Sequence, residues 1–204
     1  MFAAGVSVSF NTSDRQFRTV GRMSNDILSN NTGTPLTGVT GEHTAAGRPH
    51  GFSSVTPFLV IESAVKAIEF HRDVLGAKIG SVTEMPGPDG IPMVVHAEVC
   101  FTDGRIQVGE PNPAYGLIPP AGDGHAASYS MGLYVEDVDA TVARAVTAGA
   151  VVREPAQTFV SGDRFASIVD PFGVRWSLMT RVEDLSEEES AARVAAWAAE
   201  QQNS

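Results

Sequence analysis

The pattern of apolar and polar positions occurs twice along the chain. Residues 58–79 and 132–152 each read as a short apolar strand, about three amphipathic helical turns, a Gly-Ala pair and a second apolar strand. Each helix follows a residue that can cap it, Ser63 in the first copy and Asp137 in the second. Hairpin-rich β sequence follows both copies. The pattern therefore predicts one βαβββ unit used twice, and two such half-sheets can hold a ligand between them.

Each unit is predicted to contain one helix and four strands. In the first unit, residues 55–111, we expect a helix over 64–75 and strands at 55–61, 78–84, 92–101 and 105–110. In the second unit, residues 128–180, we expect a helix over 138–148 and strands at 128–135, 150–159, 164–169 and 174–180. Asp103-Gly104 is a strong hairpin signal, and Asp170-Pro171-Phe172-Gly173 suits a tight type I turn. His71 lies in the last turn of the first helix, where a cationic imidazole suits the helix dipole.

The flanks of the two units have a different character. Residues 1–52 are rich in Gly, Thr, Asn and Pro and show no sustained period, which predicts a flexible N-terminal extension. The chain becomes acidic after residue 182, and Ser186 with Glu189 forms a capping box. The predicted organisation is therefore a flexible extension (1–52), a paired βαβββ domain (53–182) and an acidic C-terminal helix (183–204).

Composition and charge exclude several classes of partner. The formal net charge of -10 argues against nucleic acid, because phosphate binding needs a basic surface. No apolar run approaches the ~20 residues of a membrane span, and the first residues lack the basic region of a secretory signal. The single cysteine, Cys100, cannot form an internal disulfide, which favours a reducing interior. We therefore expect a cytoplasmic protein that binds neither nucleic acid nor a membrane.

Several segments in order resemble the vicinal oxygen chelate superfamily. They are AIEFHRDVLGA, MPGPDG, HAEV, LYVEDVDATVARAVTAGA and DPFGVRWSL, spread over about 53–190. That superfamily includes glyoxalase I, extradiol dioxygenases, fosfomycin-resistance enzymes and bleomycin-resistance binding proteins. Within it, the sequence of these segments is most similar to the PhnB-like branch. The resemblance implies an α+β fold in which two tandem βαβββ modules form curved mixed sheets around a cavity, with the C-terminal helix added. It also implies a homodimer and a small-molecule ligand or substrate.

The resemblance places the superfamily's metal ligands on the first and last strands of each module. In this sequence those positions are held by Thr56, Gln107, Ser130 and Ser177. A divalent ion needs three or four converging donors, and neutral hydroxyls hold it poorly. A shift of one residue at the last position would offer Trp176 or Leu178 instead. We therefore expect no metal and no other cofactor, and we expect these four positions to contact the ligand.

His96 and Glu98 are the strongest chemical pair in the chain. Strand alternation predicts that they face the cavity with Val94, while Val95, Ala97, Val99 and Phe101 pack under the helix. A carboxylate beside an imidazole can supply a catalytic base and acid, and the pair could also hold a relocated divalent metal with Glu110 or Gln107. The same pair could equally be a polar contact at the cavity wall.

Two arginines complete the candidate ligand-binding residues. Arg175 shares the predicted cavity face with Ser177, whereas Trp176 is expected in the core. Arg164 could bind an anionic ligand, or it could pair with Asp163 or Asp170. Two functions stay open: a non-catalytic small-molecule binder of sequestering or resistance type, and a lyase, isomerase or dioxygenase that uses His96 and Glu98, with or without a relocated metal.

Overall fold

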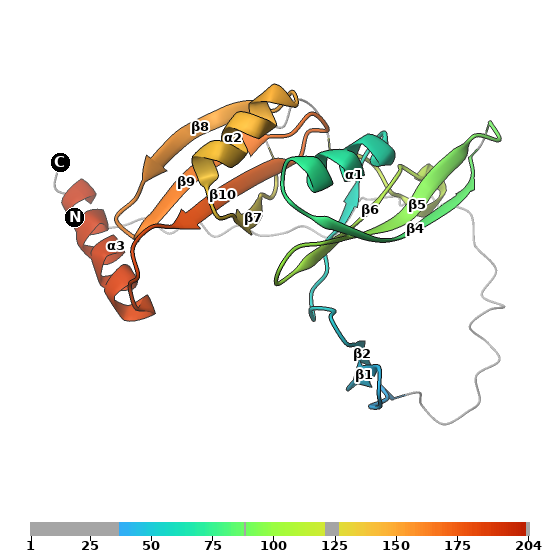
Figure 1. Ribbon diagram of the computed structural model, residues 1–204, viewed down its shortest axis with the longest axis horizontal. Coiled ribbons are helices and arrows are strands. Elements are labelled where there is room, and N and C mark those ends of the chain that lie inside the picture. The colour runs from blue at the N-terminus through green and yellow to red at the C-terminus, as the bar shows by residue number, and fades with distance from the viewer. Residues whose placement is uncertain (1–36, 88, 121–126, 203–204) are drawn as a thin grey trace, which may run out of the picture. The chain divides into compact units, whose positions relative to one another are not determined.

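The computed structural model describes residues 37–87, 89–120 and 127–202. The chain divides into two units, residues 1–38 and 39–204, and the fold described here is that of the second unit. Its two modules are drawn in Figure 1, the first in cyan to green and the second in yellow to red.

Module one is a four-stranded mixed sheet with one helix. Its sheet has the strand order β3-β6-β5-β4, in which β3 is parallel to β6 and the other pairs are antiparallel. The elements in chain order are β3 (Phe58–Val60), α1 (Ala64–Asp73), β4 (Lys78–Pro86), β5 (Pro92–Cys100) and β6 (Arg105–Gly109). The predicted hairpin at Asp103-Gly104 is confirmed, because the amide of Phe101 donates to the carbonyl of Gly104 across it at 2.8 Å.

Module two repeats the architecture. Its sheet has the order β7-β10-β9-β8, and β7 is again parallel to its neighbour β10. The elements are β7 (Met131–Tyr134), α2 (Val138–Thr147), β8 (Val151–Thr158), β9 (Asp163–Val169) and β10 (Arg175–Arg181). A short 3-10 helix, Pro113–Tyr115, lies in the segment between the modules. The identical strand order of the two sheets confirms the predicted α+β fold built from a repeated βαβββ unit.

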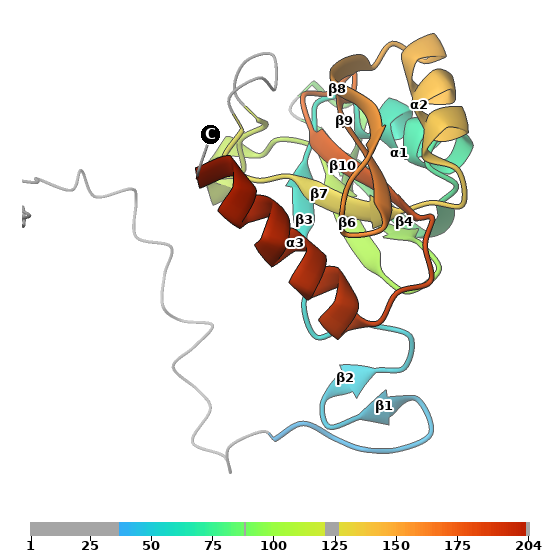
Figure 2. The same cartoon turned by 90° about the vertical axis from the view of Figure 1, so that its left-hand side faces the viewer.

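Each helix covers one face of its sheet and leaves the other face open (Figure 2). Asp137 caps α2 as predicted, since its carboxylate accepts from the amide of Ala140 at 2.9 Å. The predicted cap at Ser63 is wrong: the residue has a left-handed φ of 59° and its side chain makes no capping hydrogen bond to α1. Gly76 and Gly149 follow the two helices with positive φ, the conformation for which a residue without Cβ is suited.

The two modules share one core. Trp176 on β10 is buried and meets the ring of His71 on α1 edge-on, with centroids 5.5 Å apart. Phe70 on α1 and Phe172 before β10 make a second ring contact between the modules, at 6.1 Å. The prediction that Trp176 belongs to the core is confirmed. Its indole N–H donates to the buried carboxylate of Asp170 at 3.0 Å, and burial raises the pKa of that carboxyl.

His71 is a neutral core residue, not the cationic helix-end residue that the sequence predicted. Its side chain is fully buried, and neither ring nitrogen has a hydrogen-bond partner. Burial lowers the pKa of this imidazole to about 4, because the charged form cannot be solvated there. Its contact with Trp176 of the second module excludes water from the imidazole.

The flanking segments each contain an ordered element. Residues 44–49 form a small antiparallel pair, β1 (Thr44–Ala45) with β2 (Arg48–Pro49), inside the region predicted as a flexible extension, whose residues 1–36 lie outside the described residues. The C-terminal helix α3 spans Glu187–Gln202 and begins with the predicted capping box, since Ser186 and Glu189 exchange hydrogen bonds of 2.9 and 3.1 Å. Within the described ranges, no helix is long and apolar enough to cross a membrane.

Candidate functional site

The polar chemistry of each module lies on the face of the sheet that its helix leaves uncovered, called the open face here. Strand register assigns its members, because directly paired residues point to the same side. The open face of module one carries Phe58, His96, Glu98, Arg105 and Gln107. The open face of module two carries Ser130, Tyr134, Ser167, Arg175 and Ser177. The helix-side faces hold the buried apolar residues, including Ala97, Val99, Trp176 and Leu178.

A β-bulge corrects one face assignment on β5. Thr83 pairs with His96 but the next residue on β4, Glu84, pairs with Val94, so β5 contains one extra residue. Val94 is consequently buried in the core, although the sequence predicted that it faces the cavity. Val95 is the extra residue at the bulge. Because the bulge lies before His96, the predicted open-face positions of His96 and Glu98 are unchanged.

Glu98 is the centre of a hydrogen-bonded cluster in module one. Its carboxylate is buried, and it accepts from the Gln107 amide at 2.9 Å and from the Arg105 guanidinium at 3.2 Å. The His96 Nε2 atom lies 3.5 Å from the same carboxylate. Both carboxylate oxygens therefore have partners, and the sequence-predicted pair His96 and Glu98 is brought together with the predicted ligand residue Gln107.

Arg105 was not predicted, yet it joins three parts of the chain. One guanidinium nitrogen contacts Glu98, and another donates to the carbonyl of Gly51 at 2.8 Å. Its Cζ atom lies 3.6 Å from the centroid of the Phe52 ring, which is cation–π geometry. The only sequence signal was strand alternation with Gln107, which places both on one face. Its link to residues 51 and 52 spans more than fifty positions and has no local signature.

The open face of module two is built from hydroxyls and a loosely held arginine. The Ser130 and Ser177 hydroxyl oxygens are 2.8 Å apart and share a hydrogen bond. The Arg175 guanidinium reaches across the sheet to Glu154 on β8, at 3.4 Å. Ser167, which pairs directly with Ser177, is fully buried and its hydroxyl has no partner. The predicted residues Ser130, Ser177 and Arg175 thus lie on one surface.

Arg164 lies apart from these groups. Its guanidinium fork binds the carboxylate of Asp139 on α2, with one contact of 2.7 Å. Ala166, two residues along β9, is buried on the helix side, and Arg164 shares that side by alternation. The ion pair raises the pKa of Arg164 and lowers that of Asp139 through their side-chain hydrogen bond. Neither of the predicted partners, Asp163 and Asp170, is the one found.

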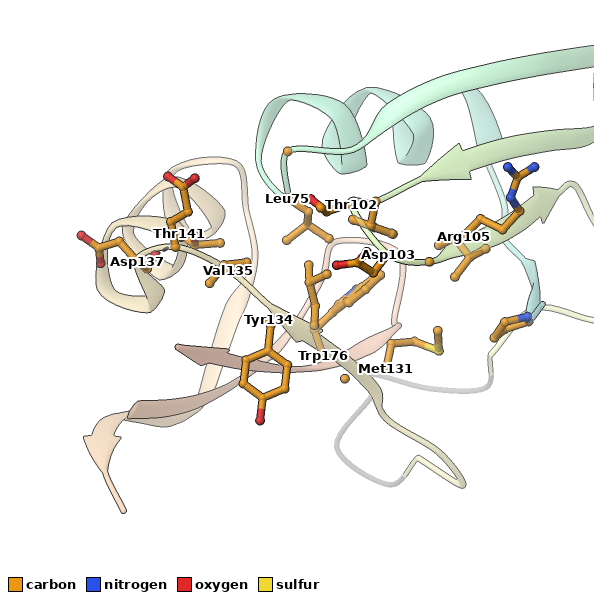
Figure 3. Close-up of a pocket in the computed structure, with 18 of the residues that line it drawn as sticks. Leu75, Thr102, Asp103, Arg105, Met131, Tyr134, Val135, Asp137, Thr141 and Trp176 are labelled. Carbon is orange, nitrogen blue, oxygen red and sulfur yellow. Dashed lines mark hydrogen bonds between the residues drawn. The ribbon is translucent and has the colours of Figure 1, made fainter. Parts of the chain in front are cut away.

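A pocket of about 660 Å³ lies at the junction of the modules. It reaches both sides of β7, since Leu133 faces the core and Tyr134 the open face. Figure 3 shows the labelled side chains that line it from both modules, among them Leu75, Asp103, Arg105, Tyr134, Asp137 and Trp176. Sequence reasoning placed a cavity between the modules but assigned none of these residues to it. Arg105 connects the pocket to the Glu98 cluster.

The sequence of the chain identifies its family. Residues 42–178 match the family model described as the Glyoxalase/Bleomycin resistance protein/Dioxygenase superfamily. The chain belongs to this superfamily. The predicted superfamily membership is confirmed, and the match covers both modules but not α3.

Known proteins similar to this superfamily member include uncharacterised ones. It is 31% identical over 144 residues to an uncharacterised protein of Mycobacterium bovis, a match that covers 68% of this chain and 90% of that protein. A Mycobacterium tuberculosis protein matches at the same identity, with 81% of its length covered. The structure of a glyoxalase family protein from Bacillus cereus is similar in fold, with a TM-score of 0.51, 18% identity, and coverage of 69% of this chain and 100% of that one. A PhnB protein from Bacillus cereus is similar at a TM-score of 0.48, 18% identity, and coverage of 63% and 99%.

The residues at the superfamily's metal positions do not fit a divalent ion. Gln107 and Ser177 occupy the same place in the two sheets, since they pair with Phe58 and Gly132 on the respective first strands. The amide of Gln107 already donates to Glu98, and Ser177 bonds to Ser130. Across residues 37–87, 89–120 and 127–202, no three His, Cys, Asp or Glu side chains gather closely enough to hold a metal ion. Glu110 therefore does not join His96 and Glu98 as a third ligand.

Proposed function

We propose that this member of the superfamily is a small-molecule-binding protein that works without the usual divalent metal, in a sequestering or resistance role. The proposal is supported by the residues at the superfamily's four metal positions, which are neutral and in part hydrogen-bonded to other side chains. Ser130 and Ser177 hydrogen-bond to each other, and Gln107 donates to Glu98. Thr56, the fourth, is a neutral hydroxyl residue. Such a donor set suits the hydroxyl, carbonyl or amine groups of an organic ligand better than a lone cation.

The junction pocket supports this function by its size and lining. Its volume of about 660 Å³ lies in the range typical of small-molecule sites. Leu75, Phe101 and Trp176 supply apolar and aromatic surface, while Arg105, Asp103 and Asp137 supply polar groups. We therefore propose that the ligand has an apolar body in the pocket and polar groups that reach the open faces.

The test combines metal analysis with a ligand screen. Tag-free protein is expected to contain close to no Ni, Zn, Fe or Mn by mass spectrometry, and incubation with these metals followed by desalting should not change this. A thermal-shift screen of apolar compounds with polar substituents should give stabilising ligands, since a ligand that binds only the folded state raises the melting temperature. About one metal ion per chain would overturn the metal-free proposal, and a screen without any stabilising compound would overturn the binding function.

A second function, catalysis by His96 and Glu98, rests on the 3.5 Å separation of the imidazole from the carboxylate. Because both Glu98 oxygens already have partners, His96 is the member that faces an incoming substrate. For ligands found in the screen, His96→Ala should reduce affinity at most in part and leave the fold intact if the protein is a binder. Detectable turnover of such a ligand that disappears in His96→Ala would establish the enzymatic alternative instead.

We further propose that the protein is a cytoplasmic homodimer whose partner covers the open faces. Phe58 and Tyr134 lie on these faces and are 37% and 58% exposed, and aromatic residues are enriched at protein–protein interfaces. Sedimentation velocity of the full chain should give one species of twice the mass of a single chain. A monomer across the concentration range would show that the open faces face solvent.

A further inference from the structure

Module two contains a cluster of buried hydrogen-bond donors without acceptors. Three atoms form it: one terminal nitrogen of Arg153, the Nε of Arg175 and the hydroxyl of Ser167. Of the described residues, only His71 has other buried side-chain nitrogen or oxygen atoms without a partner. Buried polar groups are nearly always hydrogen-bonded in folded proteins, and each exception calls for an explanation.

A β-bulge places Arg153 and Glu154 together beside Ser167. Val152 pairs with Ile168 but Glu154 pairs with Ser167, so β8 contains one extra residue at Arg153. At such a bulge two successive side chains lie opposite one partner residue, and Arg153 and Glu154 both lie opposite Ser167. Their charged groups are 3.7 Å apart. Val152 pairs with Ile168 on the helix side, so alternation places Arg153 on the open face, and the extra residue brings Glu154 to that face beside it.

Arg175 reaches the same place from β10. It is paired with Val169, two residues along β9 from Ser167, and its guanidinium extends toward Glu154 on the far side of β9. The side chain therefore crosses β9 toward the residue that is paired with Ser167. Arginines from β8 and β10 thus approach one serine from both sides.

The charge of the cluster favours an anion. Two guanidinium groups share the single carboxylate of Glu154, which leaves a local charge of +1 on a chain whose formal net charge is -10. Both contacts, at 3.7 and 3.4 Å, are longer than the 2.7–2.9 Å of a charge-assisted hydrogen bond. Glu154 is 42% exposed on its side chain and therefore partly solvated. The guanidinium fork matches the geometry of carboxylate and phosphate oxygens, which accept two parallel N–H bonds.

We propose that Arg153, Arg175 and Ser167 form an oxyanion subsite on the open face of module two, which binds a carboxylate, phosphate or phosphonate group of the ligand. The proposal rests on the proposed binding function and names the class of ligand. The oxyanion accepts from the three donors that lack acceptors, and the two arginines move from Glu154 toward it. From this subsite the ligand extends past the hydroxyls of Ser130 and Ser177 toward the junction pocket, which holds its apolar part.

Phenylphosphonate is the probe, and benzyl alcohol is its uncharged counterpart of similar size. Arginine Nε–H resonances are followed by ¹H–¹⁵N NMR while each compound is titrated into the full chain at constant ionic strength. Phenylphosphonate should shift the Arg153 and Arg175 resonances along a saturable curve, and benzyl alcohol should leave them in place. Because a hydrogen bond to a charged group typically contributes tenfold or more to affinity, Arg175→Gln should weaken binding by about tenfold or more and Ser167→Ala by about threefold.

Arg72→Gln is the matched control, since Arg72 forms an exposed ion pair with Asp73 on α1 and faces no part of the subsite. It should bind phenylphosphonate with the affinity of the unmodified chain. Arg153→Gln is a second variant, in case Arg175→Gln does not fold. Equal affinity for phenylphosphonate in all variants, or unshifted Arg153 and Arg175 resonances at saturating probe, would overturn the subsite.

The outcomes separate the subsite from the binding function. If uncharged compounds from the thermal-shift screen bind as tightly as their acidic analogues, the oxyanion subsite is wrong and the binding function stands. If no screened compound binds but phenylphosphonate still shifts Arg175 in a saturable way, the binding function in its proposed form is wrong and the subsite stands.

Discussion

The first, third and last strands of the two modules pair in the same register, but the open-face arginines differ. The guanidinium of Arg105 bonds to Glu98 in module one, whereas the Nε of Arg175 in module two has no acceptor. Arg105 and Arg175 occupy the same place in their sheets, each two residues before the paired positions Gln107 and Ser177. Opposite those positions stands Glu98 in module one and Ser167 in module two. Glu98 is an acceptor that engages the arginine of its own module. Ser167 carries no charge and makes no hydrogen bond to Arg175, whose Nε is left without an acceptor.

The equivalent arginines of the two modules therefore have different contacts. In module one the arginine is used within the protein, where it holds Glu98 and the segment at Gly51. In module two the guanidinium of the equivalent arginine donates to Glu154, at 3.4 Å. The carboxylate of Glu98 and the hydroxyl of Ser167 at the equivalent position account for this difference between the two arginines.

The largest expected effect comes from truncation of the two arginines. Arg105→Ala leaves the buried carboxylate of Glu98 without its cation and should lower the free energy of unfolding by about 3 kcal/mol. Arg175→Ala removes a longer and more exposed contact and should cost less than about 1 kcal/mol. Urea unfolding followed by circular dichroism measures both. Equal losses in the two variants would break the proposed distinction between the modules.

A second difference lies on the helices, where His71 of α1 corresponds in helix position to Ala145 of α2. The folded-state pKa of His71 is lowered to about 4 from 6.5, so the unfolded chain binds more protons between these values. Stability should therefore be intact above pH 6.5 and fall by about 2 kcal/mol as the pH drops to about 5.

His71→Leu should remove this part of the pH dependence and keep the apolar contact with Trp176. The raised pKa of Asp170 acts in the opposite direction, so the informative quantity is the difference between the variant and the unmodified chain. Melting temperatures measured at intervals between pH 7 and 5 provide it. Parallel curves for the two proteins would mean that His71 takes up a proton in the folded state.

The smallest expected change in the free energy of unfolding concerns the residues that precede α1 and α2. Asp137 caps α2 with its side chain, and Asp137→Ala should cost about 1 kcal/mol. Ser63 makes no such bond, and Ser63→Ala should change the free energy of unfolding by less than about 0.5 kcal/mol. Thermal unfolding of the two variants makes the comparison. A loss at Ser63 as large as that at Asp137 would contradict the observed difference in capping.

The fold was predictable from sequence because its signals are local and occur twice. The helical periodicity, the Asp103-Gly104 hairpin and the Ser186–Glu189 capping box each depend on residues a few positions apart, and the structure contains all of them. The predicted open-face positions of His96 and Glu98 also followed from alternation along one strand, whereas Gln107 was predicted from the superfamily's metal position.

The rest of the site depended on features that alternation cannot show. Bulges on β5 and β8 change the faces of Val94 and Glu154, and no residue type in those segments indicates where the extra residue is accommodated. The contacts of Arg105 with Phe52 and of Arg164 with Asp139 join distant segments, and so does the burial of His71 by Trp176. Each needs the packed structure, since helix or strand position alone is compatible with several partners.

The contact of His71 with Trp176 has a consequence for how the protein can be divided. A repeated sequence suggests two halves that could be expressed separately. However, the half that contains α1 would expose His71 and Phe70 to water. The other half would expose their contact partners, Trp176 and Phe172. The halves are therefore expected to melt in one transition within the intact chain and to associate when produced as separate fragments. The two copies of the sequence pattern are therefore expected to fold as one cooperative unit.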